Sequence, residues 1–187
     1  MKKREFVLPV EVCPICGAKG TFKVIGRLDD IPYFGETMET LVNCSSCNFK
    51  HADVTHLGQR EAVRHEFQIS SEEDMKVRVV RSSTGTIKVP ELGVTIRPGS
   101  GSQGYITNIE GVLNRIRDAI GSAKEGASPA KRRTAKRKLK MLEDVVQGRK
   151  RAKMIVMDPH GYSAIIDGRT KKRKLTRKEI KALEDLT

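Results

Sequence analysis

The chain has 187 residues, of which 37% are hydrophobic, 32% are charged and 4% are aromatic, and it contains no tryptophan. This length suits one medium domain, or a small module joined to a second domain. No apolar run approaches the roughly 20 residues that a transmembrane helix needs, and Glu5 and Glu11 interrupt any apolar core of a signal peptide. We therefore expect a cytoplasmic protein that has no membrane partner.

The net charge of +13 is concentrated in the last third of the chain. Residues 1–123 carry a net charge of +1, whereas residues 124–187 carry +12, in basic runs between Lys131 and Lys178. Such an asymmetry indicates an acidic partner, either a nucleic acid such as RNA or an acidic protein surface. A solvated helix face with a frayed tail accounts for the same charge equally well.

The only four cysteines form two Cys-x-x-Cys pairs, Cys13 with Cys16 and Cys44 with Cys47. Four thiolates on one small unit can surround a zinc ion tetrahedrally. Since four protein ligands leave no position for water, we predict one structural zinc ion. Iron also suits four-sulfur geometry. Two disulfides would need an oxidising compartment, and a redox pair would usually be single and set in a βαβ pattern, so both are disfavoured.

Short strand-like stretches surround the two cysteine pairs and predict a zinc ribbon at residues 1–56. These stretches lie at residues 21–28, 38–42 and 49–54, around a turn-prone segment at residues 31–35. Gly17 and Asn48 each follow the second cysteine of a pair, where the chain must bend sharply. Glycine adopts left-handed backbone freely and asparagine tolerates it, so both residues suit a knuckle that wraps a metal.

From residue 62 the pattern changes to short strands bounded by glycine, proline, serine and acidic turns. They lie at residues 63–69, 75–80, 86–89 and 94–96. Regular short strands without helices between them favour an antiparallel sandwich or barrel. The segment Gly99 to Gly104 satisfies Gly-x-Gly-x-x-Gly, but the βαβ units of a dinucleotide fold are missing, so we predict a mobile loop.

Two helices then interrupt the strands. Thr107 and Glu110 form a capping box that predicts the first helix start, and Ser128 before a proline predicts the second. Apolar residues recur with helical spacing after both starts, and Gly148 is a plausible helix end. Strand patterns resume at residues 154–157 and 162–166. We therefore predict a helical hairpin at about 107–148, inserted in a β domain of residues 57–168.

The segment 169–187 is predicted as a basic C-terminal tail with a short helix, which Thr176 and Glu179 cap. The fold class is then mainly β, of the α+β type.

None of the four histidines has a recognisable catalytic partner. His51 and His56 flank the ribbon, where four cysteines already complete the site. His65 lies next to Glu66 on a predicted strand, so the two side chains point to opposite faces and cannot chelate one ion. His160 lies in a turn. We expect these histidines to be structural or solvated, and the protein to be non-enzymatic.

With these elements in place, the chain resembles the ZPR-type zinc-finger family over roughly residues 10–167. The segments that carry the resemblance are residues 13–17, 31–34, 44–54, 74–82, 87–92, 98–111 and 158–163. The ordered series is more specific than the cysteines alone. Asn48 stands where the family usually has glycine, and Tyr162 replaces the common asparagine. The chain carries one finger-plus-β-domain module, as archaeal-type members do, whereas eukaryotic members carry two.

The resemblance implies a zinc ribbon followed by a double-stranded β-helix with a helical hairpin insertion. It also implies binding to translation elongation factor 1-alpha, as a folding or assembly factor. Which residues contact that partner is unknown from the sequence. The alternative is an RNA- or ribosome-associated protein that binds through residues 131–178. An enzyme is the third hypothesis, because double-stranded β-helices include metal oxygenases with two histidines and a carboxylate. The only matching pair, His51 and Asp53, lies in the ribbon.

Overall fold

The computed structural model describes residues 4–31, 35–58, 60–99, 101–124 and 126–185. The chain divides into two compact units, residues 1–59 and 60–187. Each unit is described by itself. The predicted turn at residues 31–35 falls largely outside the described residues, and so does one residue of the loop at 99–104.

The first unit is a single antiparallel sheet with the strand order β1-β2-β3-β4. Its strands are β1 Arg4–Val12, β2 Lys19–Ile31, β3 Gly35–Cys44 and β4 Lys50–His56. The three predicted strands are present and longer than expected. Strand β1 was not predicted, and it pairs with β2 along nearly its whole length. The unit is therefore a four-stranded ribbon sheet.

The ribbon sheet has a very small apolar core. Only Cys13, Phe22 and Cys44 are buried in its cluster, with Val10, Val24, Val42 and Phe49 packed around them. The rings of Phe22 and Phe49 stack with their centroids 6.4 Å apart. Because two of the three buried side chains are predicted metal ligands, the core and the metal centre are the same part of the molecule.

The second unit contains two antiparallel sheets. The five-stranded sheet has the order β12-β5-β10-β7-β8, and the three-stranded sheet has the order β11-β6-β9. The strands that the sequence predicted best are β5 Val63–Ile69, β7 Thr86–Val89, β8 Val94–Ile96 and β10 Ala152–Asp158. The remaining strands are β6 Arg78–Arg81, β9 Tyr105–Asn108, β11 Ala164–Ile166 and β12 Lys171–Lys174. The two sheets enclose one core and form a β-sandwich of the jelly-roll type. Double-stranded β-helix is another name for this architecture.

The predicted strand at residues 75–80 begins later than expected. A short 3-10 helix, η1 (Glu72–Lys76), occupies its start, and a second one, η2 (Pro90–Leu92), follows β7. The carboxylate of Asp74 accepts hydrogen bonds from the backbone N–H groups of Ser70 at 2.7 Å and Ser71 at 3.0 Å. Such local side-chain bonds compete with strand pairing, which is why β6 starts only at Arg78.

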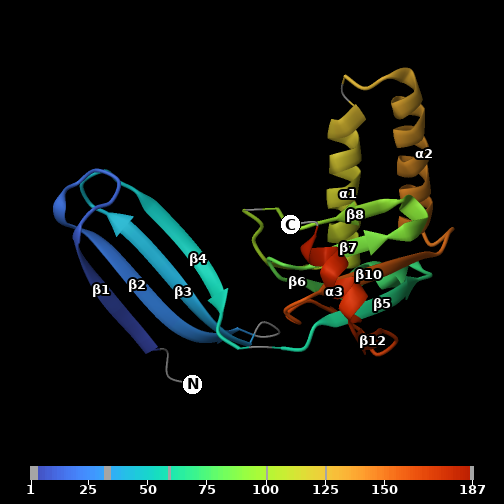
Figure 1. The fold of residues 1–187 in the computed structure, drawn as a ribbon. Coiled ribbons are helices and arrows are strands. Elements are labelled where there is room, and N and C mark those ends of the chain that lie inside the picture. Colours follow the sequence, from blue (N-terminus) through green and yellow to red (C-terminus); the bar gives the residue numbers. More distant parts are fainter. Residues whose placement is uncertain (1–3, 32–34, 59, 100, 125, 186–187) are drawn as a thin grey trace. The chain divides into compact units, whose positions relative to one another are not determined.

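The helical hairpin lies between β9 and β10, as predicted, and consists of α1 (Ile109–Lys124) and α2 (Pro129–Val146). The two helices run side by side and extend beyond the sheets (Figure 1). Their bases supply Ile109, Val112, Leu113, Ile116, Leu142 and Val145 to the main core. Gly148 follows the end of α2 with a φ of +64°, as a helix-ending glycine does.

The prediction that Thr107 caps α1 is wrong. Thr107 lies in β9 opposite Val79, so strand pairing holds it extended. The helix begins two residues later, and the backbone N–H of Gly111 donates to the side-chain oxygen of Asn108 at 2.8 Å. Asparagine is among the preferred N-cap residues, so Asn108 takes this role.

Residues 169–187 differ from the predicted tail, because part of them belongs to the sheet. Strand β12 pairs with β5, from Lys171 opposite Glu66 to Lys174 opposite Val63. All four residues of β12 are exposed and basic, so no alternation of apolar side chains revealed it. Lysine on an edge strand protects the sheet from pairing with other chains.

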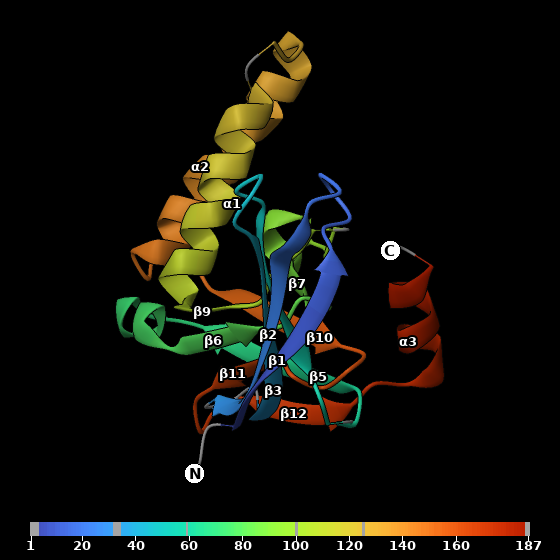
Figure 2. The ribbon, with the colours of Figure 1, turned by 90° about the vertical axis from the view of Figure 1, so that its left-hand side faces the viewer.

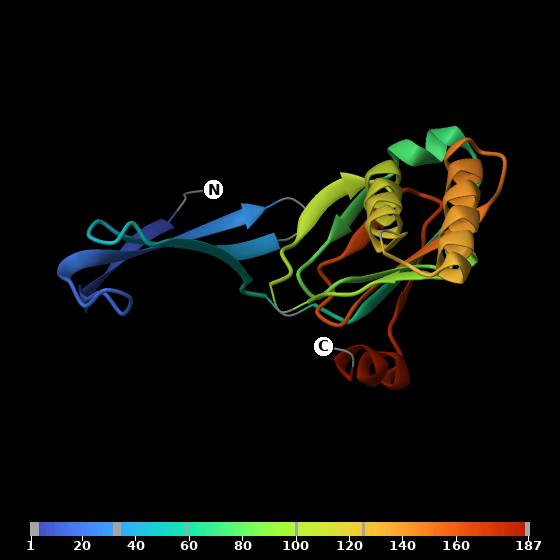
Figure 3. The same ribbon diagram turned by 90° about the horizontal axis from the view of Figure 1, so that it is seen from above.

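The short final helix is α3 (Arg177–Glu184), and it has the predicted capping box of Thr176 and Glu179. Its Ile180 and Leu183 pack against buried Ile155 and Met157 of β10. Figure 3 shows α3 on the side of the sheets opposite to α1 and α2. In the described part of the chain, no helix is long and apolar enough to cross a membrane.

Candidate metal centre

The two cysteine pairs lie in loops at one end of the ribbon sheet (Figure 1). Cys13 and Cys16 lie in the loop between β1 and β2, and Cys44 and Cys47 lie at the end of β3 and in the loop that follows. All four sulfur atoms lie within 4.8 Å of one another. The sheet therefore brings together the residues that the spacing predicted as ligands.

Both loops repeat the same backbone geometry. The N–H of Cys13 donates to the carbonyl of Ala18, and the N–H of Cys44 donates to the carbonyl of Phe49, both at 2.9 Å. Gly17 and Asn48 occupy equivalent places, with φ values of +73° and +57°. Asn48 is the only described residue other than glycine with a positive φ, so the predicted left-handed bends are confirmed.

The distances fit a tetrahedral metal site better than disulfides. Sγ of Cys16 lies 3.9 Å from Sγ of Cys44, whereas zinc–sulfur bonds of about 2.3 Å in a tetrahedron separate the sulfurs by about 3.8 Å. A disulfide requires about 2.05 Å. All four thiols are free of disulfide bonds, with Cys13 and Cys44 buried and Cys16 and Cys47 exposed.

The thiol of Cys44 is predisposed to bind as a thiolate. The hydroxyl of Thr21 lies 3.3 Å from Sγ of Cys44. This hydroxyl, with the backbone N–H of Cys47, lowers the pKa of Cys44 to about 6 against an opposing effect of desolvation. Metal coordination requires the thiolate form, which the lowered pKa favours at Cys44. At Cys47, the hydrogen bond from the N–H of Phe49 lowers the pKa, but desolvation and the other cysteine side chains outweigh it and raise the pKa to about 11.

The histidines lie apart from this cluster. His51 is exposed on β4, and in the described residues the metal-capable group consists of the four cysteines. His65 is 7% exposed on β5, and its Nδ1 accepts a hydrogen bond from the N–H of Ile165 at 3.5 Å. Burial, with a smaller contribution from Lys172, lowers the pKa of His65 to about 4. His65 is therefore a neutral side chain that links two sheets.

A second polar cluster surrounds Asp158, and sequence reasoning did not assign it a role. Asp158 is fully buried at the end of β10. Its carboxylate accepts hydrogen bonds from the hydroxyls of Ser82, Thr84 and Ser163 at 2.7, 2.8 and 2.6 Å, and from the backbone N–H groups of His160 and Tyr162 at 2.9 and 3.1 Å. Burial alone would raise the pKa of Asp158, but these donors hold it below its usual value.

The Asp158 cluster explains two of the segments that carry the family resemblance. Ser82 follows β6, Ser163 precedes β11 and Asp158 ends β10, so the cluster ties the three-stranded sheet to the five-stranded sheet. The only sequence signal was that the segments 74–82 and 158–163 both matched the family. Because every oxygen of the carboxylate is already bonded, the cluster stabilises the fold and offers no free ligand.

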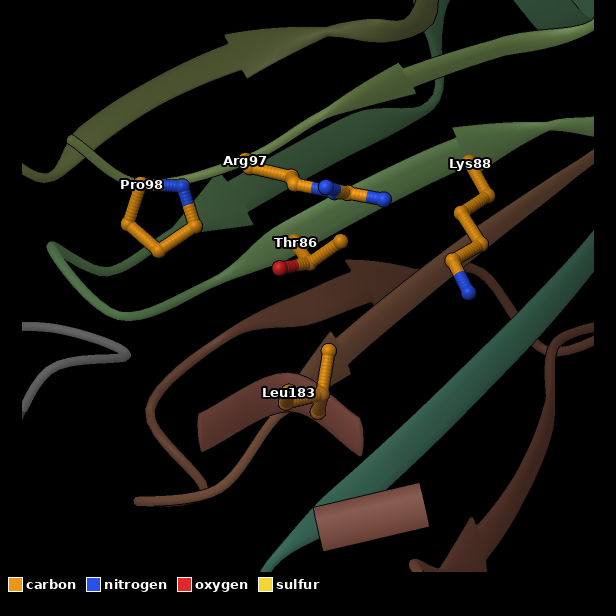
Figure 4. Close-up of a pocket in the computed structure, with 5 residues that line it drawn as sticks. All are labelled: Thr86, Lys88, Arg97, Pro98 and Leu183. Carbon is orange, nitrogen blue, oxygen red and sulfur yellow. The ribbon is translucent and has the colours of Figure 1, made fainter. Parts of the chain in front are cut away.

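A small pocket lies at the outer face of the five-stranded sheet (Figure 4). Its lining comprises Thr86, Lys88, Arg97, Pro98 and Leu183. Lys88 projects from β7, Arg97 follows the end of β8, and Leu183 reaches the pocket from α3. The lining residues include no carboxylate, histidine or cysteine.

Comparison with known proteins points to one family. The model for the ZPR1 jelly-roll domain matches residues 73–185. An uncharacterized ZPR1-like protein of Pyrococcus horikoshii is 43% identical over 175 residues, covering 91% of this chain and 78% of the relative. A ZPR1-like protein of Methanocaldococcus jannaschii is 38% identical over 174 residues, covering 92% of this chain and 88% of the relative.

Eukaryotic relatives are longer than this chain, and the matches cover only 24% to 35% of their length. The zinc finger chaperone zpr1 of Schizosaccharomyces pombe is 34% identical over 116 residues, which cover 61% of this chain but 24% of that protein. The family match also reaches residue 185, so β12 and α3 lie within the family domain. With four clustered cysteines for one structural zinc ion, followed in the chain by a jelly-roll domain, this chain belongs to the ZPR1 family as a single-module, archaeal-type member.

Proposed function

We propose that this protein is a non-enzymatic, zinc-dependent binding protein of the cytoplasm that engages translation elongation factor 1-alpha as a folding or assembly factor. The observation that carries the proposal is the closed metal centre in a ZPR1 module. Four cysteine ligands leave no coordination position for a substrate, so the ion serves to hold a surface in shape. The relative from Schizosaccharomyces pombe is named a chaperone, which supports an assembly role.

The ribbon offers a suitable surface for such a partner. Strand β1 is an edge strand, with an unpaired side available to another chain. Its Val7, Leu8 and Val12 are 55%, 52% and 43% exposed, and Ile15 in the adjoining knuckle is 61% exposed. Consecutive side chains such as Val7 and Leu8 point to opposite faces of the strand, so both faces of this edge carry exposed apolar groups, and such exposure indicates a binding surface. A non-native segment of a folding partner would supply complementary apolar groups.

The experiment is a titration of zinc-loaded protein with elongation factor 1-alpha from the same source, at low and at high salt. We expect binding that tolerates salt, because apolar contacts are screened little. Leu8→Glu and Ile15→Glu are expected to weaken it at least ten-fold. Val54→Glu is the matched control, because Val54 is 48% exposed on the opposite edge strand β4. Unchanged binding by both surface variants, or binding by a metal-free Cys44→Ser variant, would contradict the proposal.

An RNA-binding role is the second candidate, and the exposed charge of α2 favours it. Lys131, Arg132, Arg133, Lys136 and Arg137 are all exposed on this helix. Binding to phosphates would weaken steeply as salt rises, because each neutralised phosphate releases counterions. Steep salt dependence with RNA, together with no binding to the elongation factor, would favour this function over the first.

A further inference from the structure

Two arginines flank one tyrosine ring in the second unit. Tyr105 begins β9, and Arg81 ends β6 directly opposite it in the sheet. The guanidinium carbon of Arg81 lies 5.5 Å from the centre of the Tyr105 ring, and that of Arg115 lies 4.4 Å from the same centre. Arg115 comes from α1, which rises from the end of β9 next to β6 (Figure 2). Two positive charges therefore share one aromatic ring.

These two charges have no acidic partner in the part of the chain that the structure describes. Arg81 is 4% exposed, and its side chain donates only to the carbonyl of Gly85 at 2.8 Å and the hydroxyl of Ser102 at 3.1 Å. Arg115 contacts the ring without an ion pair. Asp158 attracts Arg81 at longer range, but its own oxygens are filled. Buried charges are normally paired, and Arg81 keeps three of its five N–H donors unused.

The hydroxyl of Tyr105 is another polar group that lacks a partner among the described residues. It is a buried polar atom for which no hydrogen-bond partner exists among the described residues. Buried hydroxyl groups nearly always have a partner, so each exception calls for an explanation such as an unoccupied ligand site. The ring that carries this hydroxyl contacts both guanidinium groups, and Ser102 accepts a hydrogen bond from Arg81, so the cluster is rich in N–H and O–H groups.

The glycine-rich loop before β9 contributes Ser102 to this cluster. Ser102 belongs to the segment Gly99 to Gly104 that the sequence singled out. A Cβ placed on Gly99 or Gly101 would meet no atom within 4 Å, so the loop is open around these two residues. Serine, glycine and arginine are also the residue types from which phosphate-binding loops are made.

We propose that Arg81, Arg115 and Tyr105, with Ser102, bind a phosphate group. The planar fork of arginine matches phosphate oxygens with paired hydrogen bonds. Two guanidinium charges suit a dianion, and the hydroxyl of Tyr105 donates to a third oxygen. The phosphate is either the free ion or the head of a small phosphate monoester. This site does not depend on the proposed protein partner.

The test is isothermal titration calorimetry of the intact zinc-loaded protein at constant ionic strength in chloride buffer. The two ligands are inorganic phosphate and adenosine monophosphate, so that the free ion and an ester are compared. The variants are Arg115→Gln and Tyr105→Phe, which remove one charge and one hydroxyl. The control is Arg133→Gln, because Arg133 is exposed on α2 and the charge change is the same.

We expect the unaltered protein and Arg133→Gln to bind equally, while Arg115→Gln and Tyr105→Phe bind about ten-fold more weakly or not at all. Tighter binding of the ester identifies a phosphorylated small molecule, and binding of phosphate alone identifies the free ion. The proposal is overturned if the unaltered protein binds neither ligand at millimolar concentration. It is also overturned if Arg133→Gln weakens binding as much as Arg115→Gln, since the effect would then reflect net charge only.

Discussion

Replacing Cys44 by serine should unfold the ribbon and leave the second unit folded. Cys44 is the most informative ligand to change, because it is 2% exposed and belongs to the ribbon core. Serine is nearly the same size and still reaches Thr21, so packing changes little. What the variant loses is the thiolate, and with it tight zinc binding. The experiment therefore separates the contribution of the metal from that of the side-chain volume.

The expected magnitude follows from how little else holds the ribbon together. Apart from its cysteines, Phe22 is the only buried side chain of that core, and burying one such side chain contributes about 1.5–3 kcal/mol. A structural zinc contributes roughly 10–16 kcal/mol in small finger peptides. Ordering the 13 residues of β2 costs at least ~13 kcal/mol of backbone entropy. The metal is the larger stabilising contribution, so its loss should unfold the sheet.

Hydrogen exchange with mass spectrometry, combined with metal analysis, measures this effect directly. In the Cys44→Ser variant we expect β2 and β3 to lose protection, while β5 and β10 keep theirs. Ser46→Ala is the control, because Ser46 is exposed in the same loop and is no ligand. A variant that carries no metal and still protects the amides of β2 and β3 would refute the reasoning.

Three further outcomes are expected. Asp158→Asn should lower the free energy of unfolding, measured by denaturant titration, by about 3 kcal/mol, because an amide cannot accept the five hydrogen bonds that the carboxylate receives. Ser163→Ala should lower it by about 1 kcal/mol in the same titration. Asn48 has a φ of +57°, so Asn48→Val should destabilise the ribbon by about 1–2 kcal/mol, whereas Asn48→Gly should leave its stability unchanged. The measurement is zinc retention in the presence of a chelator, which Asn48→Val should weaken. His65 titrates near 4 when folded and near 6.5 when unfolded, so the unfolded state binds more protons between these values. Stability should therefore be complete above pH 6.5 and fall by roughly 3 kcal/mol towards pH 4, and His65→Gln should flatten this pH dependence of the melting temperature.

The metal centre was predictable because it depends on residue type and short spacing. Two Cys-x-x-Cys pairs and a residue that accepts left-handed backbone after each are local features of the sequence. The helical hairpin was predictable for a similar reason, since its apolar spacing and the proline at the start of α2 are local. The start of α1 was misplaced by one residue, with Asn108 and not Thr107 as the N-cap, because pairing between Thr107 and Val79 is a tertiary effect that overrides a local capping pattern.

Strands β1 and β12 were missed because an edge strand needs only one partner. The sequence of β12 is four consecutive basic residues, and hydrogen bonds to β5 alone place it in the sheet. In β1, Pro9 and the acidic Glu5 and Glu11 obscure the strand pattern, although β2 pairs with it. The Asp158 cluster was not predictable because it joins residues 82–84 to residues 158–163, and the bonded pairs between these two segments are 74 to 81 residues apart in the chain.

The fold divides the basic residues of the last third between ion pairs within the domain and separate exposed faces. This division limits how much of the charge one binding partner can contact. Arg173 of β12 donates to the carboxylate of Glu179 at 2.6 and 2.7 Å, and Arg64 donates to the same group at 3.1 Å. These contacts fix α3 on the sheet and consume part of the positive charge within the domain. The basic side chains of α2 lie on the opposite side, beyond the main core. A partner that binds the basic surface would therefore meet two separate faces, and shortening the chain after β10 would also remove the strands β11 and β12. Single charge reversals on α2, which leave the sheet intact, are thus the sounder way to test the electrostatic role.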